Sequence, residues 1–452
     1  MAVLAMLFCI QASAQTNKWQ DIHRVKKGET IFGIARDYGI SLQQLIDANP
    51  EMKQEGYELK KGDWVFVPFA KAEDVKATAL PSAQAAQKAA GTTTKATKPN
   101  DGVIRIGVML PLHNNDGDGR RMVEYYRGML LALNQLDTEG IKTEVQAWNV
   151  PIDADIRTKL LEDGVSRLNV IFGPLYSNMV DPLADYCQRN DIKMVIPFSI
   201  TGNEVDRNAN IFQVYQTPDE LNNKSIAAFI ERFPNHHPIF INCNDATSDK
   251  GVFTSGLRRQ LDAKSRSYNL TNLNTPQADF AKAFSPNQPN VIVVNTARSP
   301  QLNQVFAKLD SLKQTHPGLA ISMFGYTEWL MYQKYDLAQF FKYSVYIPTT
   351  FYYNAVSDRT EALEKLYLTA YGEPMDQSAL PRFAITGYDH TMFFIRGLKE
   401  QGEKFNGLAD LSKWKPLQTR LNFKRIGQGG YKNQHFQLVH FKVDQTMESI
   451  TY

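Results

Sequence analysis

The first patterned part of the chain is a small unit at residues 22–68, in which two helical patterns stand between two extended ones. Residues 22–26 and 63–67 are predicted strands, and residues 30–38 and 41–49 are predicted helices, in the order βααβ. Such a unit lies near the lower size limit for independent folding. The apolar helical positions recur at the three- and four-residue spacing of one buried face; they are Ile31, Ile34, Ala35, Tyr38, Leu42, Leu45 and Ile46.

Residues 70–101 separate this unit from the rest of the chain. They contain no aromatic residue and consist mostly of Ala, Thr, Lys and Gln. Because such a segment cannot bury enough apolar surface to order itself, it is predicted to be a flexible linker. A flexible chain of this length would hold its ends roughly 30 Å apart.

Residues 102–452 alternate between strand and helix patterns. Residues 103–110 form a nearly continuous apolar strand, which is typical of a strand covered on both faces. The alternation predicts parallel sheets with right-handed crossovers, in two α/β lobes that end in antiparallel edge strands at 435–443 and 447–452. Further strands are predicted at 144–148, 170–172, 193–197, 239–243, 291–295 and 320–324, and helices at 126–136, 154–168, 178–190, 218–233, 252–261 and 301–314.

The chain begins with an apolar run, MAVLAMLFCIQASAQ, whose small residues 12–14 predict a secretion signal cut before Gln15. The usual positive region is missing, which leaves open a true start further upstream. Cys9 raises the alternative of a lipoprotein, but the bulky Phe8 before it disfavours the cleavage that lipidation needs. No later apolar run reaches about 18 residues, so no membrane span is expected after the signal.

Composition and charge narrow the class of protein. Of the 452 residues, 43% are hydrophobic, and the formal net charge is +3, which argues against a polyanion-binding protein. After the signal only Cys187 and Cys243 remain. Two cysteines cannot form a disulfide framework, and both lie in apolar patterns, so they are predicted to be buried free thiols.

The small unit resembles a LysM domain through residues 25–31 (VKKGETI), the pair Asn49-Pro50, and residues 59–68 (LKKGDWVFVP). LysM domains bind N-acetylglucosamine-containing glycans, chiefly peptidoglycan, in a groove between the loop after the first strand and the loop after the second helix. For Thr30 and Ile31, helix capping and packing are the alternative roles. The resemblance implies that the glycan-binding residues are Gly28, Glu29, Thr30, Ile31, Phe32, Asn49, Pro50, Glu51 and Met52.

The large unit resembles a type I periplasmic binding protein, the two-lobed class that includes leucine-binding receptors. The resemblance is carried by residues 104–112 (IRIGVMLPL), 170–201, 211–221 and 385–398. In this family the chain crosses between the lobes three times. The implied lobes are about 102–217 with 348–396, and about 218–347 with 397–452; the crossings are expected near 216–219, 344–350 and 396–405.

In open parallel sheets ligands bind beyond the carboxyl ends of the strands, where the loops at 173–177 and 199–201 are expected to lie. The resemblance implies that hydroxyls and amides at Ser177, Ser199 and Thr201 hold a ligand carboxylate. It also implies that an acid of the other lobe, Glu328 or else Asp245, holds an ammonium group. Ordinary turn and cap chemistry is the alternative role for these residues. The predicted cleft residues are Tyr176, Ser177, Ser199, Ile200, Thr201, Asp245 and Glu328.

Gln216 weakens a strict amino-acid-receptor assignment, because many members of the family carry Arg at this position. Residues 114–119 look like the first half of an EF-hand loop, but position 12 would be Tyr125 rather than the required Glu. A cleft-lip loop is the preferred interpretation. No histidine pair has metal-ligand spacing, and no hydrolase or nucleotide-binding motif occurs. The sequence therefore predicts no metal, no cofactor and no enzymatic activity.

Together these features predict a non-enzymatic periplasmic protein that is held on the cell wall by its LysM domain. Its clamshell would recognise a partner protein or a small ligand, with a role in regulating peptidoglycan synthesis; a known relative of the fold is a lipoprotein that activates a peptidoglycan synthase. The alternative is a solute-binding receptor for amino acids that serves an ABC-type transporter or a sensor. The anchor favours the first hypothesis, since a wall-bound receptor shuttles poorly to a permease.

Overall fold

The computed structural model describes residues 21–25, 31, 34–35, 38, 40, 42–53, 59–68, 98–99, 101–198, 201–354, 357–408 and 414–452. The chain divides into two compact units, Met1–Thr94 and Lys95–Tyr452. The predicted signal and nearly all of the predicted linker lie outside the described residues. So do six of the predicted site residues, namely Gly28, Glu29, Thr30, Phe32, Ser199 and Ile200.

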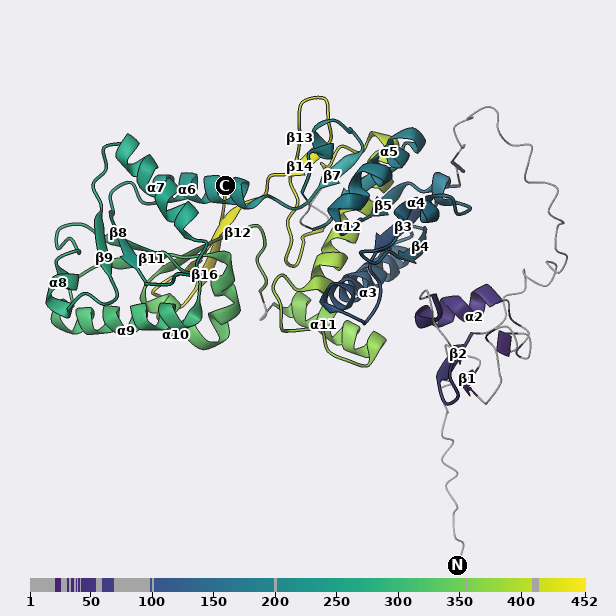
Figure 1. The fold of residues 1–452 in the computed structure, drawn as a ribbon, viewed down its shortest axis with the longest axis horizontal. Coiled ribbons are helices and arrows are strands. Elements are labelled where there is room, and N and C mark those ends of the chain that lie inside the picture. The colour runs from purple at the N-terminus through teal and green to yellow at the C-terminus, as the bar shows by residue number, and fades with distance from the viewer. Residues whose placement is uncertain are drawn as a thin grey trace, which may run out of the picture. The chain divides into compact units, whose positions relative to one another are not determined.

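The small unit contains a two-stranded antiparallel sheet and helical segments, in agreement with the predicted βααβ order. Strand β1 (Asp21–Arg24) pairs with β2 (Trp64–Val67), and α2 (Leu42–Ala48) leads into the 3₁₀ turn η1 (Pro50–Lys53) (Figure 1). Burial alternates along β2, because successive side chains of a strand point to opposite faces. The core residues are Val25, Ile34, Ala35, Ile40, Leu45, Met52, Val65 and Val67.

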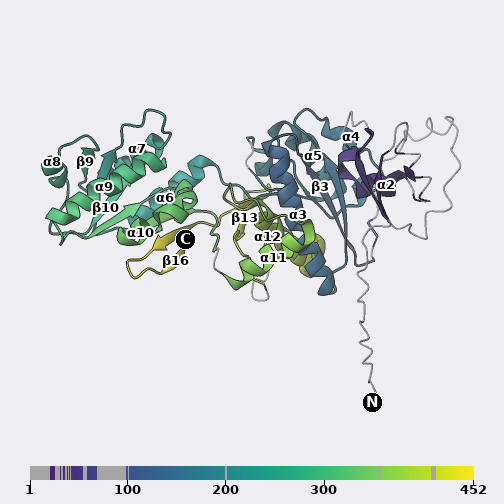
Figure 2. The same ribbon diagram turned by 90° about the horizontal axis from the view of Figure 1, so that it is seen from below.

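The large unit is built on two seven-stranded sheets, which define its first and second lobes (Figures 1 and 2). The first sheet has the order β13 (Phe423–Arg425), β14 (Tyr431–Asn433), β7 (Ile211–Gln213), β6 (Lys193–Ile196), β5 (Val170–Phe172), β3 (Ile104–Leu110), β4 (Thr143–Asn149). The second has the order β16 (Met447–Thr451), β15 (Gln437–Phe441), β12 (Val345–Thr349), β11 (Ile321–Phe324), β10 (Asn290–Val294), β8 (His237–Asn242), β9 (Asn269–Asn272).

Most strand pairs in both sheets are parallel, as the alternating pattern predicts. Antiparallel pairing is confined to the β13–β14 pair and to the C-terminal strands β15 and β16 beside β12. The helices that pack with the first sheet are α3 (Gly117–Thr138), α4 (Ile156–Leu160), α5 (Val180–Asn190), α11 (Asp358–Tyr371) and α12 (Phe383–Gln401). Those that pack with the second are α6 (Pro218–Arg232), α7 (Gly251–Ala263), α8 (Gln277–Ala281), α9 (Ser299–Thr315) and α10 (Gln333–Lys342).

Strand β3 is apolar apart from Arg105, because helices cover both faces of the first sheet. Val108 and Leu110 belong to the core beneath α3, α11 and α12, whereas Met109 belongs to the core beneath α4 and α5. The alternation of neighbouring residues between two cores follows from the two-residue period of a strand. The prediction that the nearly continuous apolar run at 103–110 is a strand covered on both faces is thus confirmed.

Helices α3 and α12 pack with their backbones in close approach. A Cβ atom added at Gly128 would lie 1.8 Å from the carbonyl oxygen of Ala384, and one added at Gly387 would lie 2.0 Å from that of Tyr125. Both contacts are with backbone atoms, which cannot move aside as a flexible side chain would. The two glycines therefore set how closely these helices approach.

The predicted helix at 154–168 is wrong in length. The structure has only α4 there, followed by a 3₁₀ turn at Val165–Arg167. Gly164 stands between them with φ of +90°, a backbone conformation that a continuing helix cannot contain. Further 3₁₀ turns lie at Ser177–Met179, Glu204–Asp206, Thr327–Tyr332 and Gly402–Lys404.

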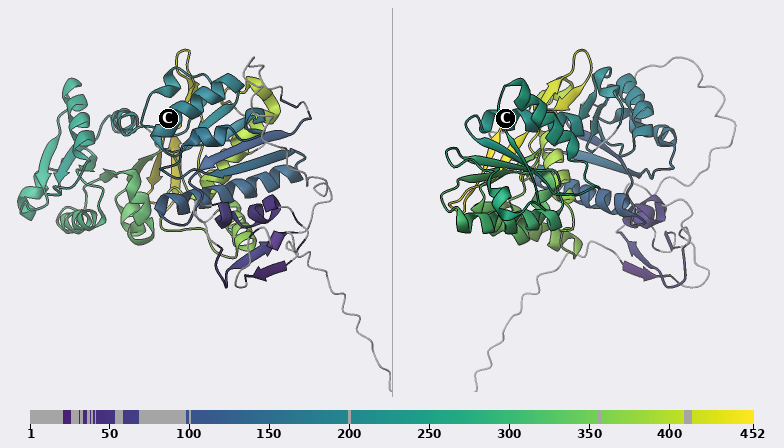
Figure 3. Two further views of the ribbon diagram at one scale, coloured as in Figure 1. Left: turned by 45° about the vertical axis from the view of Figure 1, so that its right-hand side comes forward. Right: turned by 60° about the vertical axis from the view of Figure 1, so that its left-hand side comes forward.

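The predicted assignment of all of 397–452 to the second lobe is also wrong. Strand β14 pairs in parallel with β7 and extends the first sheet, so the third crossing lies after Asn433 rather than near 396–405. Two contacts hold this pairing: the ring of Tyr431 stacks on Phe212 with centroids 4.7 Å apart, and Gly430 lies against the Ile211 carbonyl. Figure 3 shows the C-terminal strands, those of both sheets, in yellow. Within the described ranges, no helix is long and apolar enough to cross a membrane.

Candidate functional site

Asn49 of the small unit is fully buried and joins the end of α2 to β2. Its side-chain amide donates to the carbonyl oxygens of Leu45 and Phe66, each at 2.7 Å, and its Oδ1 accepts from the Phe66 amide at 2.7 Å. Every one of these partners is a backbone group, so the side chain ties the backbone of α2 to that of β2. Asn49 is therefore a structural residue, since its backbone amide also donates to the Ile46 carbonyl oxygen and its own carbonyl oxygen accepts from the Met52 amide.

The other described glycan-binding candidates differ in accessibility. Met52 is buried in the small core, and Ile31 is partly buried against it, as the packing alternative expects. Pro50 and Glu51 are exposed on the 3₁₀ turn that follows α2. Of the described candidates, these two offer the most surface to a ligand.

A cavity of about 660 Å³ in the large unit is lined by residues of both lobes. Its walls are mainly aromatic and aliphatic, which is typical of small-molecule sites. The apolar and aromatic lining residues include Met122, Leu175, Phe198, Val214, Leu221, Phe253, Tyr326, Met331, Phe351, Leu380 and Phe383; the polar ones include Gln216, Asn222, Ser225, Thr327, Thr350, Thr386, His390, Thr419 and Asn433.

The charged side chains of the cavity wall are paired with one another. In the first lobe, Arg121 donates to Asp118 at 2.8 Å. In the second, Lys250 donates to Glu328 at 2.6 Å and lies 3.2 Å from Asp249. These bonds raise the pKa of Lys250, although its partial burial acts in the opposite direction. The lysine is thus positively charged at neutral pH, and it neutralises Glu328.

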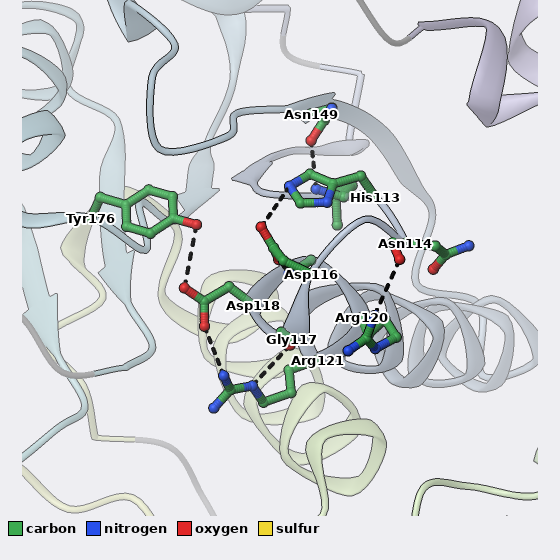
Figure 4. Close-up of polar contacts among 11 residues, drawn as sticks. His113, Asn114, Asp116, Gly117, Asp118, Arg120, Arg121, Asn149 and Tyr176 are labelled. Carbon is green, nitrogen blue, oxygen red and sulfur yellow. Dashed lines mark hydrogen bonds and ion pairs between the residues drawn. The ribbon is translucent and has the colours of Figure 1, made fainter.

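Figure 4 shows the loop that precedes α3, at the first-lobe wall of the cavity. Asp116 caps the helix by accepting from the Gly119 amide at 2.7 Å, and that bond lowers the pKa of its carboxyl group. Asp118 accepts from Arg121 and lies 3.5 Å from the Tyr176 hydroxyl. The acidic residues of this EF-hand-like stretch therefore cap and orient a helix. No cluster of three metal-ligating side chains occurs anywhere in the described ranges.

The structure distributes the predicted cleft residues over several positions. Glu328 lines the cavity. The Tyr176 hydroxyl contacts Asp118, which also lines the cavity. Ser177 accepts a hydrogen bond from the Thr201 amide at 2.8 Å, so these two predicted carboxylate ligands lie together. Asp245 accepts from Thr247 and Thr296 at 2.7 Å each, which lowers the pKa of its carboxyl group.

Gln216, which stands in place of the expected Arg, lies where the chain first crosses between the lobes. Its Nε2 donates to the His435 carbonyl oxygen at 2.6 Å, and its Oε1 accepts from Lys224 at 2.8 Å. Lys224 also donates to the Gln434 carbonyl oxygen at 3.0 Å. These bonds join the first crossing to the third, so the polar groups of Gln216 are occupied within the hinge.

Sequence reasoning missed several residues of the cavity wall, among them Arg121, Lys250 and His390. Lys250 and Glu328 are far apart in the chain, and no local pattern pairs them. The spacing of Phe383, Thr386 and His390 on α12 could have shown a shared face. Cys187 and Cys243 are both free and buried, as predicted, and burial holds the pKa of Cys243 at about 12.

Residues 23–65 match the family model of the LysM domain. The small unit is a LysM domain. No curated protein matches the chain. A LysM domain indicates glycan binding, and within this one the structure describes Ile31, Asn49, Pro50, Glu51 and Met52 of the predicted contacts.

The large unit has the fold of type I periplasmic binding proteins. A Rhodospirillum rubrum protein assigned to branched-chain amino acid ABC transport is 14% identical, over 77% of this chain and 100% of that one, with a TM-score of 0.53. A substrate-binding protein from Desulfitobacterium hafniense in complex with Leu is 15% identical over the same shares, with a TM-score of 0.40. LivJ from Streptococcus pneumoniae, in complex with isoleucine, is 14% identical over the same shares, with a TM-score of 0.41. At such identities the likeness concerns the fold alone.

Two buried histidines of the large unit predict a loss of stability in mild acid. Burial lowers the pKa of His390 to about 3 and that of His435 to about 4. The unfolded chain takes up these protons below about pH 6.5, so the two histidines lower the free energy of unfolding as the pH drops from 6.5 towards 4. Asp389 acts in the opposite direction, because burial raises the pKa of its carboxyl group to about 7. Each histidine contributes at most about 1.4 kcal/mol per pH unit.

Urea unfolding at pH 7, 6 and 5 measures this effect. The variant His390→Asn, which has no titrating ring, should lose a clearly smaller part of its stability over that range than the wild type. Equal pH dependence of the two proteins would show that His390 is not held neutral.

Proposed function

We propose that this chain is a non-enzymatic recognition protein of the periplasm, attached to the cell wall by its LysM domain. The domain binds peptidoglycan, and the cavity of the large unit binds an apolar group of a partner protein or of a small ligand. Through that recognition the protein regulates peptidoglycan synthesis. The family match of residues 23–65 supports the glycan-binding half of the proposal.

The second half of the proposal, that the cavity binds an apolar group, rests on the pairing of the charged side chains around the cavity. A free amino acid brings an ammonium and a carboxylate group, and each needs an opposite charge or several hydrogen-bond donors when it is buried. Here Glu328 is already neutralised by Lys250, and Arg121 by Asp118. A zwitterion would have to compete with these pairs, whereas an apolar or neutral group would not.

The alternative function is a solute-binding receptor for amino acids that serves an ABC-type transporter or a sensor. The fold of the large unit and the named ligands of the similar structures favour it. Ser177 and Thr201 also lie together, as a carboxylate site of that kind requires. This function needs Glu328 to exchange Lys250 for the ligand ammonium.

Melting temperatures measured with free amino acids separate the two functions. Leucine, isoleucine and valine at millimolar concentration should shift the melting temperature of the full chain by less than about 1 °C. A receptor with micromolar affinity would gain about 4 kcal/mol at a thousandfold ligand excess, which corresponds to roughly 5–15 °C for a domain of this size.

Two variants serve as controls for that measurement. Thr201→Val removes a hydroxyl but keeps the hydrogen bond from the backbone amide of residue 201 to Ser177. Glu328→Gln removes the charge that would hold the ligand ammonium group. A shift of several degrees with leucine that both variants abolish would establish the transport function and contradict our proposal.

A further inference from the structure

We infer that His390 and Thr419 form a hydrogen-bonding subsite in the cavity for a neutral amide or hydroxyl group of the ligand. Both residues line the cavity, and their side chains are at least nine-tenths buried. Within the described part of the chain, the Nε2 atom of His390 and the Oγ1 atom of Thr419 have no hydrogen-bond partner. The inference rests on the proposed function, because it takes the cavity to be a ligand site.

One face of helix α12 borders the cavity, and His390 lies on that face. Phe383, Thr386 and His390 are spaced by three and four residues, and all three line the cavity. The backbone of Thr419 is fixed by Asp389, the neighbour of His390 in α12, whose Oδ2 accepts from the Thr419 amide at 2.7 Å, and Thr419 lines the same cavity. The same carboxylate accepts from two further amides, so the position of the Thr419 backbone is well determined.

The remaining ring nitrogen of His390 is already engaged. Its Nδ1 lies 3.0 Å from the hydroxyl of Tyr125, which is itself fully buried on α3. Depending on the tautomer, Nε2 is then a donor or an acceptor. Because burial lowers the pKa of His390 to about 3, the ring is neutral and offers no charge to a carboxylate. A neutral ligand group is the partner that this arrangement favours.

Aromatic side chains surround the polar pair. The ring of Phe198 lies 5.2 Å from that of Tyr125 and 5.5 Å from that of Phe383, measured between centroids. A ligand that reaches His390 therefore carries apolar surface beside its polar group. Amide-capped amino acids have this composition, and so do acylated fragments in general.

Buried polar groups without partners are rare, because each one left unpaired destabilises the folded state. Two of them line one cavity, where a bound group can complete their hydrogen bonds. An ordered water molecule is the competing occupant, since it needs only two to four polar neighbours. The experiment below separates water from ligand.

The test uses the full chain and isothermal titration calorimetry with two neutral probes, N-acetyl-leucinamide and N-acetyl-phenylalaninamide, against free leucine and phenylalanine. At least one capped probe should bind more tightly than its free amino acid. His390→Asn keeps a partner for Tyr125 but lacks the atom that corresponds to Nε2, and Thr419→Val removes the hydroxyl. Each variant should weaken binding of the capped probe by about two- to tenfold.

Two further variants control for structural effects. His390→Gln places an amide near the position of Nε2 and should bind within about twofold of the wild type. Thr391→Val removes a hydroxyl that is equally buried and unpartnered but does not line the cavity, so its affinity should be unchanged. A loss in Thr391→Val as large as in Thr419→Val would overturn the inference.

Asn222→Trp, which fills the cavity from α6, distinguishes the inference from the function on which it rests. If it abolishes probe binding while His390→Asn and Thr419→Val bind normally, the cavity is a ligand site and the polar subsite is wrong, with water as its occupant. If Asn222→Trp has no effect, or no capped probe binds more tightly than its free amino acid, the neutral-ligand cavity itself is wrong, and the subsite with it.

Discussion

Replacing Gly387 by alanine is expected to destabilise the first lobe by about 3 kcal/mol or more, which should lower its melting temperature by roughly 5–10 °C. The new Cβ atom would lie 2.0 Å from the carbonyl oxygen of Tyr125 in α3. Since the contact is with backbone, the helices α3 and α12 must separate to accommodate it. Separation would open the core that both helices share and would displace His390 from Tyr125.

A matched control is available on the second lobe. Gly251 begins α7, and a Cβ atom added there would meet nothing within 4 Å. Gly251→Ala should therefore leave the melting temperature unchanged or raise it slightly, because alanine is the better helix former. Circular dichroism during heating compares the two variants. A Gly387→Ala protein that melts within 1 °C of the wild type would show that the helices do not pack as closely as described.

Replacing Asn49 by alanine should abolish binding of the full chain to purified sacculi. The change removes all three hydrogen bonds by which the side chain holds the backbone of Leu45 and Phe66. The expected destabilisation is about 3 kcal/mol or more. A domain of this size rarely has more than about 3–5 kcal/mol of stability, so the LysM domain should largely unfold.

Co-sedimentation with sacculi measures the binding, and calorimetric unfolding shows that the large unit is unaffected. Glu51→Gln is the control within the same region, because Glu51 is exposed and its replacement keeps the shape of the side chain. That variant should remain folded, so any loss of binding in it would report on contact with the glycan. If Asn49→Ala still pellets with sacculi like the wild type, either its hydrogen bonds do not hold the domain or the domain is not the anchor.

Several features of the fold follow from local pattern. The helix α6 begins at Pro218 because Thr217 and Glu220 form a reciprocal cap, with Thr217 Oγ1 accepting from the Glu220 amide at 3.2 Å and Glu220 accepting from the Thr217 amide at 2.8 Å. The buried strand β5 was predicted at its observed bounds because its residues are apolar on both faces. Such signals are readable because they lie within one helical turn or one strand.

The lobe assignment failed where the elements are both short and largely polar. Strands β13 and β14 have three residues each, as β5 does, but they read FKR and YKN, so no apolar run marks them. What places β14 in the first sheet is its contact with β7, above all the stacking of Tyr431 on Phe212. That contact joins parts of the chain that are remote in sequence.

The sequence by itself determined the LysM domain and the α/β class, because periodicity, caps and strand ends are local properties. Only the tertiary structure decided the chemistry of the cavity. It neutralises Glu328 with Lys250, which lies 78 residues earlier in the chain, and it brings His390 and Thr419 to one cavity. The physical reason is that charge and hydrogen-bonding capacity depend on which side chains become neighbours, and folding brings those neighbours together from distant parts of the chain.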